Sequence, residues 1–349
     1  GDSFTSTDAE NNTLFGYDAG TAITTGDDNT AFGKDALKST TSAEYNTAIG
    51  AEALKDGTGG MDNTAVGYQA LKAATQDRNT AVGYKAFAAC TGSRNVGIGW
   101  NVAYAATGAD YNIGIGNEAL YSLGEGDYNV AIGSGAGMSL TSSSSNVAIG
   151  KDAFKTSSTG TRAVAVGYEA LKVCTSNDNT AVGHQAGFSI TTGYQNSAFG
   201  SYALGTGYEV YSCTSIGYYT MGASTTAALC TAVGESAMKK VTTGYGNTGV
   251  GYRAGYYNLV GGYNVSMGYN ANYRLKGSGN TGIGTFAAQG ATGATGDYNT
   301  ALGYQALAAV SSGSNNVTLG KTAGNTLTTG SNNICVGYDA QASAVDVSN

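Results

Sequence analysis

Two cysteines, Cys213 and Cys230, have a spacing that could support covalent chemistry. They lie 17 residues apart, which is also the commonest interval of a repeat that runs through the sequence. Stacked repeats would place their Cα atoms about 4.8 Å apart, within the range that a disulfide spans. One interpretation is therefore a disulfide, and the other is a pair of small polarizable residues that replace asparagine in the stack. Both stay open, while Cys90, Cys174 and Cys335 are interpreted as small core residues.

Other catalytic chemistry finds little support in the sequence. The one histidine, His184, occupies a variable position of the repeat at which tyrosine is the most frequent residue, so we interpret it as a solvated surface residue. No cysteine and histidine spacing is typical of zinc, and no glycine-rich phosphate loop is present. Acidic residues recur singly and not in the paired rows of a calcium roll. We therefore expect neither enzymatic activity nor a bound cofactor or metal.

Tyrosine is the residue type most suited to recognition in this chain. It follows the fixed glycine of the repeat in nine copies, a position that is otherwise mostly polar and is expected to face outward. Twelve of the 25 tyrosines lie between Tyr202 and Tyr273. Tyrosine offers a large rigid contact area and a hydroxyl group, although packing over strands or between chains is the alternative that we favour for most copies. The candidate recognition residues of this zone are Tyr218, Tyr219, Tyr252, Tyr256, Tyr257 and Tyr269.

The element that must position these side chains is a short repeated phrase. Its clearest copy runs from Asn63 to Leu71 and reads NTAVGYQAL, and twenty copies begin between Asn12 and Asn333. Fourteen of the nineteen intervals are 17 residues, four are 16 and one is 19. A short fixed period is typical of a chain that stacks turn upon turn. A helical hairpin repeat needs roughly 33 residues, so we predict that each copy forms one coil of a β-solenoid.

Each position of the phrase has its own chemistry. The first is asparagine in seventeen copies, the second is Thr, Val, Ile or Ser, the fourth is large and apolar, and the fifth is glycine in all twenty. Positions two and four share a face of an extended strand, and we predict that this face points inward. The fixed glycine would end the strand at a tight bend or a close backbone approach. The small eighth residue, alanine in eighteen copies, predicts a second short strand or a corner in a narrow interior.

The asparagine row has two interpretations. One is a row of amides that binds a sugar or an ion. The other is an asparagine ladder, in which stacked side chains bond to one another and to the backbone at a turn. We favour the ladder, because a binding site rarely needs its residue in every coil.

The overall prediction is an all-β protein, a parallel β-solenoid or β-roll of about twenty 17-residue coils. Proline is absent from all 349 residues, which fits continuous parallel pairing because proline has no backbone N–H to donate. Residues 12–341 would form a single repeat domain, with an N-terminal lead-in, 1–11, and a C-terminal tail, 342–349. The chain starts without methionine, and an open stack of strands needs caps, so we expect flanking fibre or capping domains.

Charge and hydropathy argue against several kinds of partner. Charged residues make up 12% of the chain, and the formal net charge is −7. Phosphate backbones need a basic face, so nucleic acid is not an expected partner. The sequence contains no run of about 18 apolar residues, so we expect no membrane insertion.

The phrases that start at Asn129 and Asn146 both read NVAIG, and they resemble the N/S-x-V-A-I-G repeat of trimeric autotransporter adhesin heads. The NTAVGYQAL form is similar to repeats of bacteriophage tail fibres and related bacterial surface fibres. The resemblance covers residues 12 to about 341, and it implies a left-handed parallel β-roll assembled as a homotrimer. Handedness rests on the resemblance alone, since the right-handed crossover preference would favour the opposite hand. The adhesin repeat is shorter, and the extra residues here are expected either to lengthen an outer loop or to change the cross-section of the coil.

The resulting functional hypothesis is a structural and adhesive rod of a virion or bacterial surface fibre, working outside the cell. One coil offers only about three inward apolar side chains, and such a thin core also favours a homotrimer. Reach and many weak contacts would attach the rod to a glycan or protein receptor on a cell surface. An ice-binding solenoid is one alternative, because the second position forms a row rich in threonine, although that row contains Val and Ile and is expected to face inward. A glycan-active β-helix enzyme is another, less favoured because no cluster of acids and bases is visible.

Overall fold

The computed structural model describes residues 9–342, which form only short strands and turns. They build a parallel β-solenoid of about 19 turns with about 17 residues per turn, so the predicted all-β solenoid is confirmed. Residues 1–8 and 343–349 lie outside the described residues, and with them most of the predicted lead-in and tail. Residues 9–342 contain no helix with the length and hydropathy that a membrane crossing requires.

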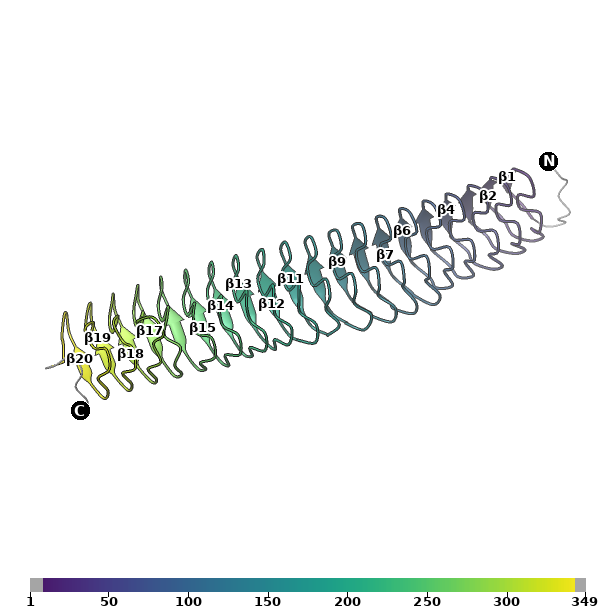
Figure 1. Ribbon diagram of the computed structural model, residues 1–349. Helices are drawn as coiled ribbons and strands as arrows, with labels where there is room; N and C mark the ends of the chain where they lie inside the picture. Colours follow the sequence, from purple (N-terminus) through teal and green to yellow (C-terminus); the bar gives the residue numbers. More distant parts are fainter. Residues whose placement is uncertain (1–8, 343–349) are drawn as a thin grey trace. The chain divides into compact units, whose positions relative to one another are not determined.

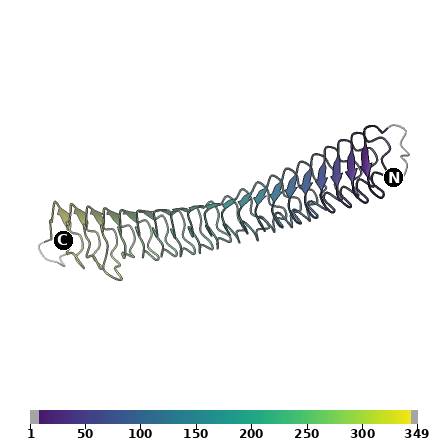
Figure 2. The ribbon, with the colours of Figure 1, turned by 90° about the horizontal axis from the view of Figure 1, so that it is seen from above.

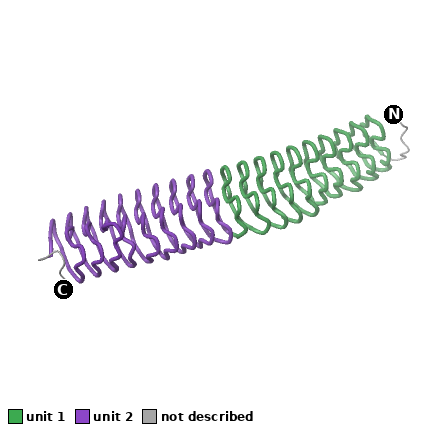
Figure 3. Tube along the Cα trace, viewed as in Figure 1, with its two compact units in different colours: residues 1–177 green, residues 178–349 purple. Residues whose placement is uncertain are grey.

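The solenoid divides into two compact units, residues 1–177 and residues 178–349 (Figure 3). Within each unit, ten strands of three residues pair in parallel with their neighbours in the chain (Figure 1). The interpretation of residues 12–341 as one domain stays a prediction. The strands of the first unit are β1 (Thr13–Phe15), β2 (Thr30–Phe32), β3 (Thr47–Ile49), β4 (Thr64–Val66), β5 (Thr80–Val82), β6 (Val96–Ile98), β7 (Ile113–Ile115), β8 (Val130–Ile132), β9 (Val147–Ile149) and β10 (Val164–Val166). Those of the second unit are β11 (Thr180–Val182), β12 (Ser197–Phe199), β13 (Thr214–Ile216), β14 (Thr231–Val233), β15 (Thr248–Val250), β16 (Val265–Met267), β17 (Thr281–Ile283), β18 (Thr300–Leu302), β19 (Val317–Leu319) and β20 (Ile334–Val336).

Successive copies of the repeat lie directly over one another. Val66 of β4 is the register partner of Val82 of β5. The N–H of Thr64 donates to the carbonyl of Asn79 over 2.8 Å, and the N–H of Gly83 donates to the carbonyl of Val66 over 2.7 Å. Equivalent bonds recur within each unit, because a chain without proline keeps a donor at every strand residue.

The prediction that positions two and four of the phrase point inward is wrong. In β5 the middle residue, Ala81, is fully buried, whereas Thr80 is half-exposed and Val82 is exposed. The reason is the ninth residue of the coil, a buried Leu, Phe or Met in eleven of the twenty copies, such as Phe87, which fills the narrow interior. A Cβ added at Gly97, the middle residue of β6, would lie 2.4 Å from the Phe87 ring. Only a small residue therefore fits on the inner side of the strand, and the large apolar residues face outward.

The fixed glycine has two physical reasons to be glycine. Its φ lies between 123° and 144° in all twenty copies, a region that L-residues rarely adopt. A Cβ at Gly133 would also lie 2.6 Å from the carbonyl oxygen of Gly150 in the next coil. The predicted close backbone approach at this position is therefore confirmed.

The corners of the coil use left-handed backbone at three further positions, mostly without glycine. Glu118, Leu120 and Tyr128 have φ values of 55°, 56° and 57°. Such a conformation costs an L-residue about 1–2 kcal/mol, and bonds between coils offset this cost. The N–H of Leu120 donates to the carbonyl of Ala136 over 3.0 Å, and that of Tyr128 donates to Asp110 over 3.1 Å. The buried eighth residue lies in these turns, so it forms a corner and not a second strand. In Figure 2 the strands of the second unit follow one edge of its coils, and turns complete each coil.

The asparagines of position one form a buried ladder. The Oδ1 atom of Asn112 accepts hydrogen bonds from the backbone N–H of Asn129 over 2.9 Å and from its Nδ2 over 3.0 Å. The Nδ2 of Asn112 donates to the carbonyl of Gly126 over 2.9 Å. Both asparagines are fully buried. The ladder interpretation is confirmed, and these amides are occupied by structural bonds.

Candidate recognition site

The six candidate tyrosines fall into three groups in the second unit. In the first group, Tyr218 is exposed and meets the half-buried Tyr219 edge-on, with ring centroids 4.6 Å apart. Tyr219 in turn stacks on Tyr202 over 4.6 Å. The ammonium group of Lys239 lies 4.3 Å from the centre of the Tyr219 ring. Neighbours therefore cover Tyr219, and Tyr218 presents the more open ring.

Tyr252 and Tyr269 form the second group, stacked with ring centroids 5.0 Å apart. They follow the fixed glycine in neighbouring coils, where Tyr269 is exposed and Tyr252 half-buried. The guanidinium of Arg253 lies 4.9 Å from the centre of the Tyr252 ring and 5.7 Å from that of Tyr256. Its Nε atom is buried and has no hydrogen-bond partner. Aromatic faces, and not a carboxylate, therefore hold this cation in place.

The third group joins two candidates to a tyrosine that was not among them. The Tyr256 ring lies 4.7 Å from Tyr257 and 5.4 Å from Tyr273, and the Tyr257 and Tyr273 rings meet edge-on over 5.3 Å. Burial raises the pKa of the Tyr256 phenol above its ordinary value. Tyr257 remains open to solvent on one side.

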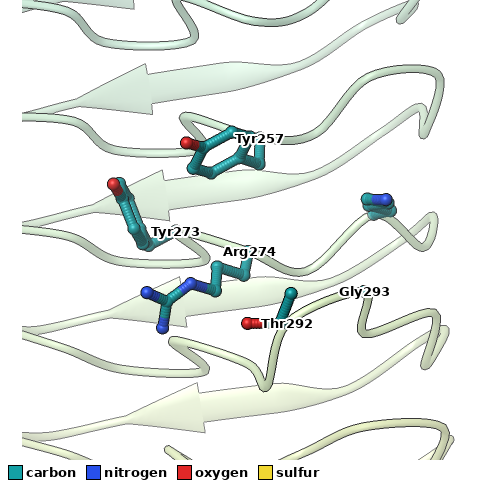
Figure 4. Close-up of a pocket in the computed structure, with 6 residues that line it drawn as sticks. Tyr257, Tyr273, Arg274, Thr292 and Gly293 are labelled. Atoms are coloured by element: carbon teal, nitrogen blue, oxygen red, sulfur yellow. The ribbon is translucent and has the colours of Figure 1, made fainter.

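A pocket of about 380 Å³ opens beside this third group (Figure 4). The guanidinium of Arg274 lies 5.3 Å from the centre of the Tyr273 ring. In Figure 4 the hydroxyl of Thr292 points toward the side of the pocket that holds Arg274. Of the six candidate tyrosines, Tyr257 lines the pocket. The full lining consists of Tyr257, Tyr273, Arg274, Lys276, Thr292 and Gly293.

The pocket lies where the repeat changes length. The coil 264–279 has 16 residues and the next coil, 280–298, has 19. Strands β16 and β17 of these coils stay paired in register. The three additional residues must therefore bulge out from the turns of the longer coil.

Backbone bonds locate this bulge. The N–H of Arg274 donates to the carbonyl of Gln289 over 2.9 Å, and the N–H of Lys276 donates to the carbonyl of Ala294 over 2.9 Å. Residues 290–293 therefore stand against a single residue of the shorter coil. The bulge forms one wall of the pocket, and the shorter coil forms the other.

A tight turn shapes the bulge. The N–H of Ala294 donates to the carbonyl of Ala291 over 3.1 Å, which makes Thr292 and Gly293 the central residues of the turn. Gly293 has a φ of 82°, as the third residue of a type II turn requires. Thr292 is exposed at its tip. The turn thus presents the threonine hydroxyl at the mouth of the pocket.

The surroundings of the pocket are basic although the chain is acidic. Residues 236–296 contain five cationic side chains and no Asp or Glu. None of the five forms an ion pair within the described range 9–342. Our sequence reasoning missed this cluster, and a run of 61 residues without a carboxylate was the signal that could have found it. The five cations are Lys239, Lys240, Arg253, Arg274 and Lys276.

Cys213 and Cys230 are buried free thiols. The Sγ of Cys213 lies 3.6 Å from the carbonyl oxygen of Ala227, which is fourteen residues further along the chain. In the asparagine ladder, the Nδ2 donor likewise contacts the carbonyl oxygen fourteen residues further along. A hydrogen bond with Cys230 and burial raise the pKa of the Cys213 thiol. The thiols thus replace asparagine in the ladder, and a disulfide between them stays a prediction for oxidising conditions. Cys90, Cys174 and Cys335 are buried as interpreted.

The one histidine lies outside the pocket lining. His184 is exposed, and its ring meets that of Tyr202 edge-on over 5.1 Å. Within residues 9–342, no group of three His, Cys, Asp or Glu side chains is placed to hold a metal ion. The Tyr–Arg–Lys pocket combines aromatic, cationic and hydroxyl groups that could bind a ligand.

Comparison with known proteins adds no family to this geometry. A scan against protein-family models found no match, and a search of curated proteins found none either. The resemblance to adhesin heads and phage fibres stays a prediction, and the function has to be inferred from the surfaces.

Proposed function

We propose that this protein is a structural and adhesive rod of a homotrimeric fibre, which works outside the cell on a virion or a bacterial surface. Three copies pack through the outer faces of their strands, and outward loops contact a glycan or protein receptor on a cell surface. Flanking fibre or capping domains cover the open strand edges. The proposal includes a left-handed coil, on the basis of the resemblance to adhesin heads.

The observation that carries this proposal is an apolar column on the outer face of the strands, formed by the fourth residue of the phrase. Ile98 is 41% exposed and Phe199 is 40% exposed. Single apolar residues on a surface are ordinary, whereas a contiguous row of them marks an interface. The exposed members are Phe15, Phe32, Ile49, Val82, Ile98 and Ile132 in the first unit, and Phe199, Ile216, Val250, Met267, Leu302, Leu319 and Val336 in the second.

Further copies of the same chain are the partners that fit the apolar column. The column repeats with the coil spacing of about 4.8 Å, and another copy presents side chains at the same spacing. A coil buries few large side chains, such as Leu71 or Phe87, and the coil 280–298 buries only alanines among its apolar residues, so the core of a single copy is thin. Burial of the column between copies would add an apolar contact for every coil. The proposed number of copies, three and not two, rests on the resemblance to trimeric adhesin heads.

Native mass spectrometry of the full chain tests the assembly, and we expect three times the monomer mass. Replacing both Ile98 and Ile132 by lysine should release monomers, because a charge buried without a partner is costly. The matched control replaces Thr58 and Thr107, exposed loop residues of the same unit, by lysine. It should leave the mass unchanged, and circular dichroism should show the same strand content for both variants. A monomeric unsubstituted chain, or a trimer that survives the isoleucine replacements, would reject the proposal.

An ice-binding solenoid is a second candidate, because the structure removes the argument that its threonine row faces inward. The threonine row was predicted to face inward, but Thr64 and Thr80 lie half-exposed on the outer face. The row is still broken by five apolar residues in successive coils between Val96 and Val164. A thermal-hysteresis measurement on the full chain decides this point, since only an ice-binding surface opens a gap between the melting and freezing points.

A glycan-active enzyme has no observation in its favour. Glycoside hydrolysis ordinarily uses a pair of carboxyl groups, and the lining of the pocket contains none. We therefore propose attachment without turnover. Release of reducing ends from an acidic polysaccharide would contradict this part of the proposal.

A further inference from the structure

We propose that the pocket between the 16-residue and 19-residue coils binds one acidic sugar residue of a polyanionic glycan. The ligand class is a sugar that carries a carboxylate or a sulfate. The groups that would hold it are Tyr257, Tyr273, Arg274, Lys276 and Thr292. This inference rests on the proposed attachment function and names the ligand class for it.

The size and the aromatic wall of the pocket fit a sugar ring. Its volume of about 380 Å³ lies within the roughly 300–1,000 Å³ that small-ligand sites occupy. Tyr257 leaves 38% of its surface exposed and meets Tyr273 edge-on. The C–H face of a sugar packs against an aromatic ring, while its hydroxyl groups bond to phenols and to a hydroxyl such as that of Thr292.

Two cations make the pocket selective for an anion. Neither Arg274 nor Lys276 has a carboxylate partner in residues 9–342. The Tyr273 ring anchors the guanidinium of Arg274, which keeps its N–H groups available for a carboxylate or a sulfate. Asp297 is the next acidic residue along the chain, and its carboxylate accepts the backbone N–H of Ser278 over 2.7 Å. No acidic side chain in the lining opposes an anionic ligand.

The distribution of charge favours this site over the rest of the surface. Residues 236–296 hold five cations and no carboxylate side chain, while the rest of the chain holds twenty-four acidic and twelve basic residues. A polyanion is therefore repelled by most of the chain and attracted to this segment. A nucleic acid would need a basic groove that follows many phosphates, and the first unit, with eighteen acidic and eleven basic residues, offers none. A pocket for one charged residue thus favours a glycan.

The bulge is tied to the next coil by the N–H of Ala291, which donates to the carbonyl of Val310 over 2.8 Å, but the repeat does not need three additional residues to stack. Coils of 16 and 17 residues suffice at the eighteen other intervals of the repeat. Additional loop residues cost little stability, and loops that a rigid scaffold positions commonly carry function. The added residues here place Thr292 opposite Tyr273 and Arg274, across the pocket (Figure 4). The one long interval of the repeat therefore coincides with a pocket of mixed aromatic and cationic lining.

A ligand-observed NMR titration of the full chain tests the proposal. The probes are glucuronic acid, N-acetylneuraminic acid and N-acetylglucosamine 6-sulfate, with glucose as the neutral control. At least one acidic sugar should bind at least about tenfold more tightly than glucose. Arg274→Gln should weaken that binding by about tenfold or more, because it removes a charge-assisted bond. The matched control is Lys321→Gln, which removes a cation 5.5 Å from the Tyr338 ring, and it should leave the binding unchanged.

The probes and the oligomeric state separate the possible outcomes. Preference for the carboxylated or for the sulfated sugars would identify the source of the anion within the proposed class. Equal binding of glucose, or acidic-sugar binding that Arg274→Gln leaves intact, would overturn the proposal. Tighter binding of an oligothymidylate than of an acidic polysaccharide would also overturn it, in favour of nucleic acid. A trimer that binds no acidic sugar would reject this inference alone, whereas a monomer that binds one would reject the fibre and leave the pocket standing.

Discussion

The side-chain oxygen of Asn79 accepts a hydrogen bond from the backbone N–H of Asn95 in the next coil, over 3.0 Å. Asn95 stands in the same relation to Asn112, over 2.9 Å. The bond satisfies a buried backbone donor where the chain enters each strand, a donor that would otherwise carry a desolvation penalty. Each asparagine therefore supports the coil that follows it.

Asn112→Ala should lower the free energy of unfolding by about 2–4 kcal/mol, because it leaves buried polar groups without partners. The groups affected are the N–H of Asn129 and the carbonyl of Gly126. Urea denaturation followed by circular dichroism measures the change. The control Asn117→Ala removes an exposed amide five residues away and should change the stability by less than about 0.5 kcal/mol. Equal losses in the two variants would show that the ladder contributes little.

Gly133→Ala should destabilise the first unit by about 2 kcal/mol or more, since it combines an unfavourable φ with a backbone clash. The added Cβ would meet the carbonyl oxygen of Gly150 at 2.6 Å, at a φ of 132°. The matched substitution is Gly59→Ala, because nothing lies within 4 Å of a Cβ there. That variant should keep the midpoint of the unsubstituted chain in thermal denaturation. If Gly133→Ala left the stability unchanged, neighbouring coils would have to move apart to accommodate the added Cβ.

The register of the coils could be predicted from the sequence, because a fixed period leaves only one way to stack identical positions. Val66 over Val82 follows from this periodicity alone. The glycine of every copy likewise signalled a close backbone approach, since no side chain is tolerated there. Both predictions depend on which residue recurs, and the sequence shows this directly.

The direction of the strand faces could not be predicted in the same way. Alternation says that Thr80 and Val82 share a face, but it does not say which face is the inner one. That choice depends on the side chain that fills the coil from the opposite corner. Phe87 leaves room only for Gly97, and Met238 leaves room only for Gly249, where a Cβ would lie 2.7 Å from Met238. The small middle residue was the clue, and our prediction gave more weight to the apolar character of its neighbours.

Two other features depend on contacts between coils that residue types do not signal. Leu120 and Tyr128 adopt left-handed φ although neither residue favours it, because bonds to adjacent coils hold them there. In the candidate site, Tyr257 is both a predicted recognition residue and part of the pocket lining, whereas Arg274 and Thr292 were missed. The lengths of the two coils were visible in the sequence. The turn that brings Thr292 to the pocket was not.

The two stacked cysteines should behave differently from the other three under oxidation. Neighbouring coils place the Cα atoms of Cys213 and Cys230 about 4.8 Å apart, a separation that a disulfide can span. A hydrogen bond with Cys213 holds the pKa of Cys230 below its ordinary value, so Cys230 supplies the reactive thiolate. Treatment of the native chain with diamide should therefore remove two hydrogens and link these two residues, as peptide mass mapping would show. Cys90 should stay reduced and resist iodoacetamide at pH 8, because burial raises its pKa to about 11 and leaves little thiolate.

The variant Cys230→Ser supplies the control for this experiment. It should abolish the diamide-dependent mass change and leave Cys213 reduced, because none of the remaining thiols lies in an adjacent coil at the same position of the repeat. A disulfide that includes Cys90 or Cys174 would require coils to come out of register, since these two share a position but lie five coils apart. Such a product, or no product from Cys213 and Cys230, would contradict the stacking of equal positions at this point of the solenoid.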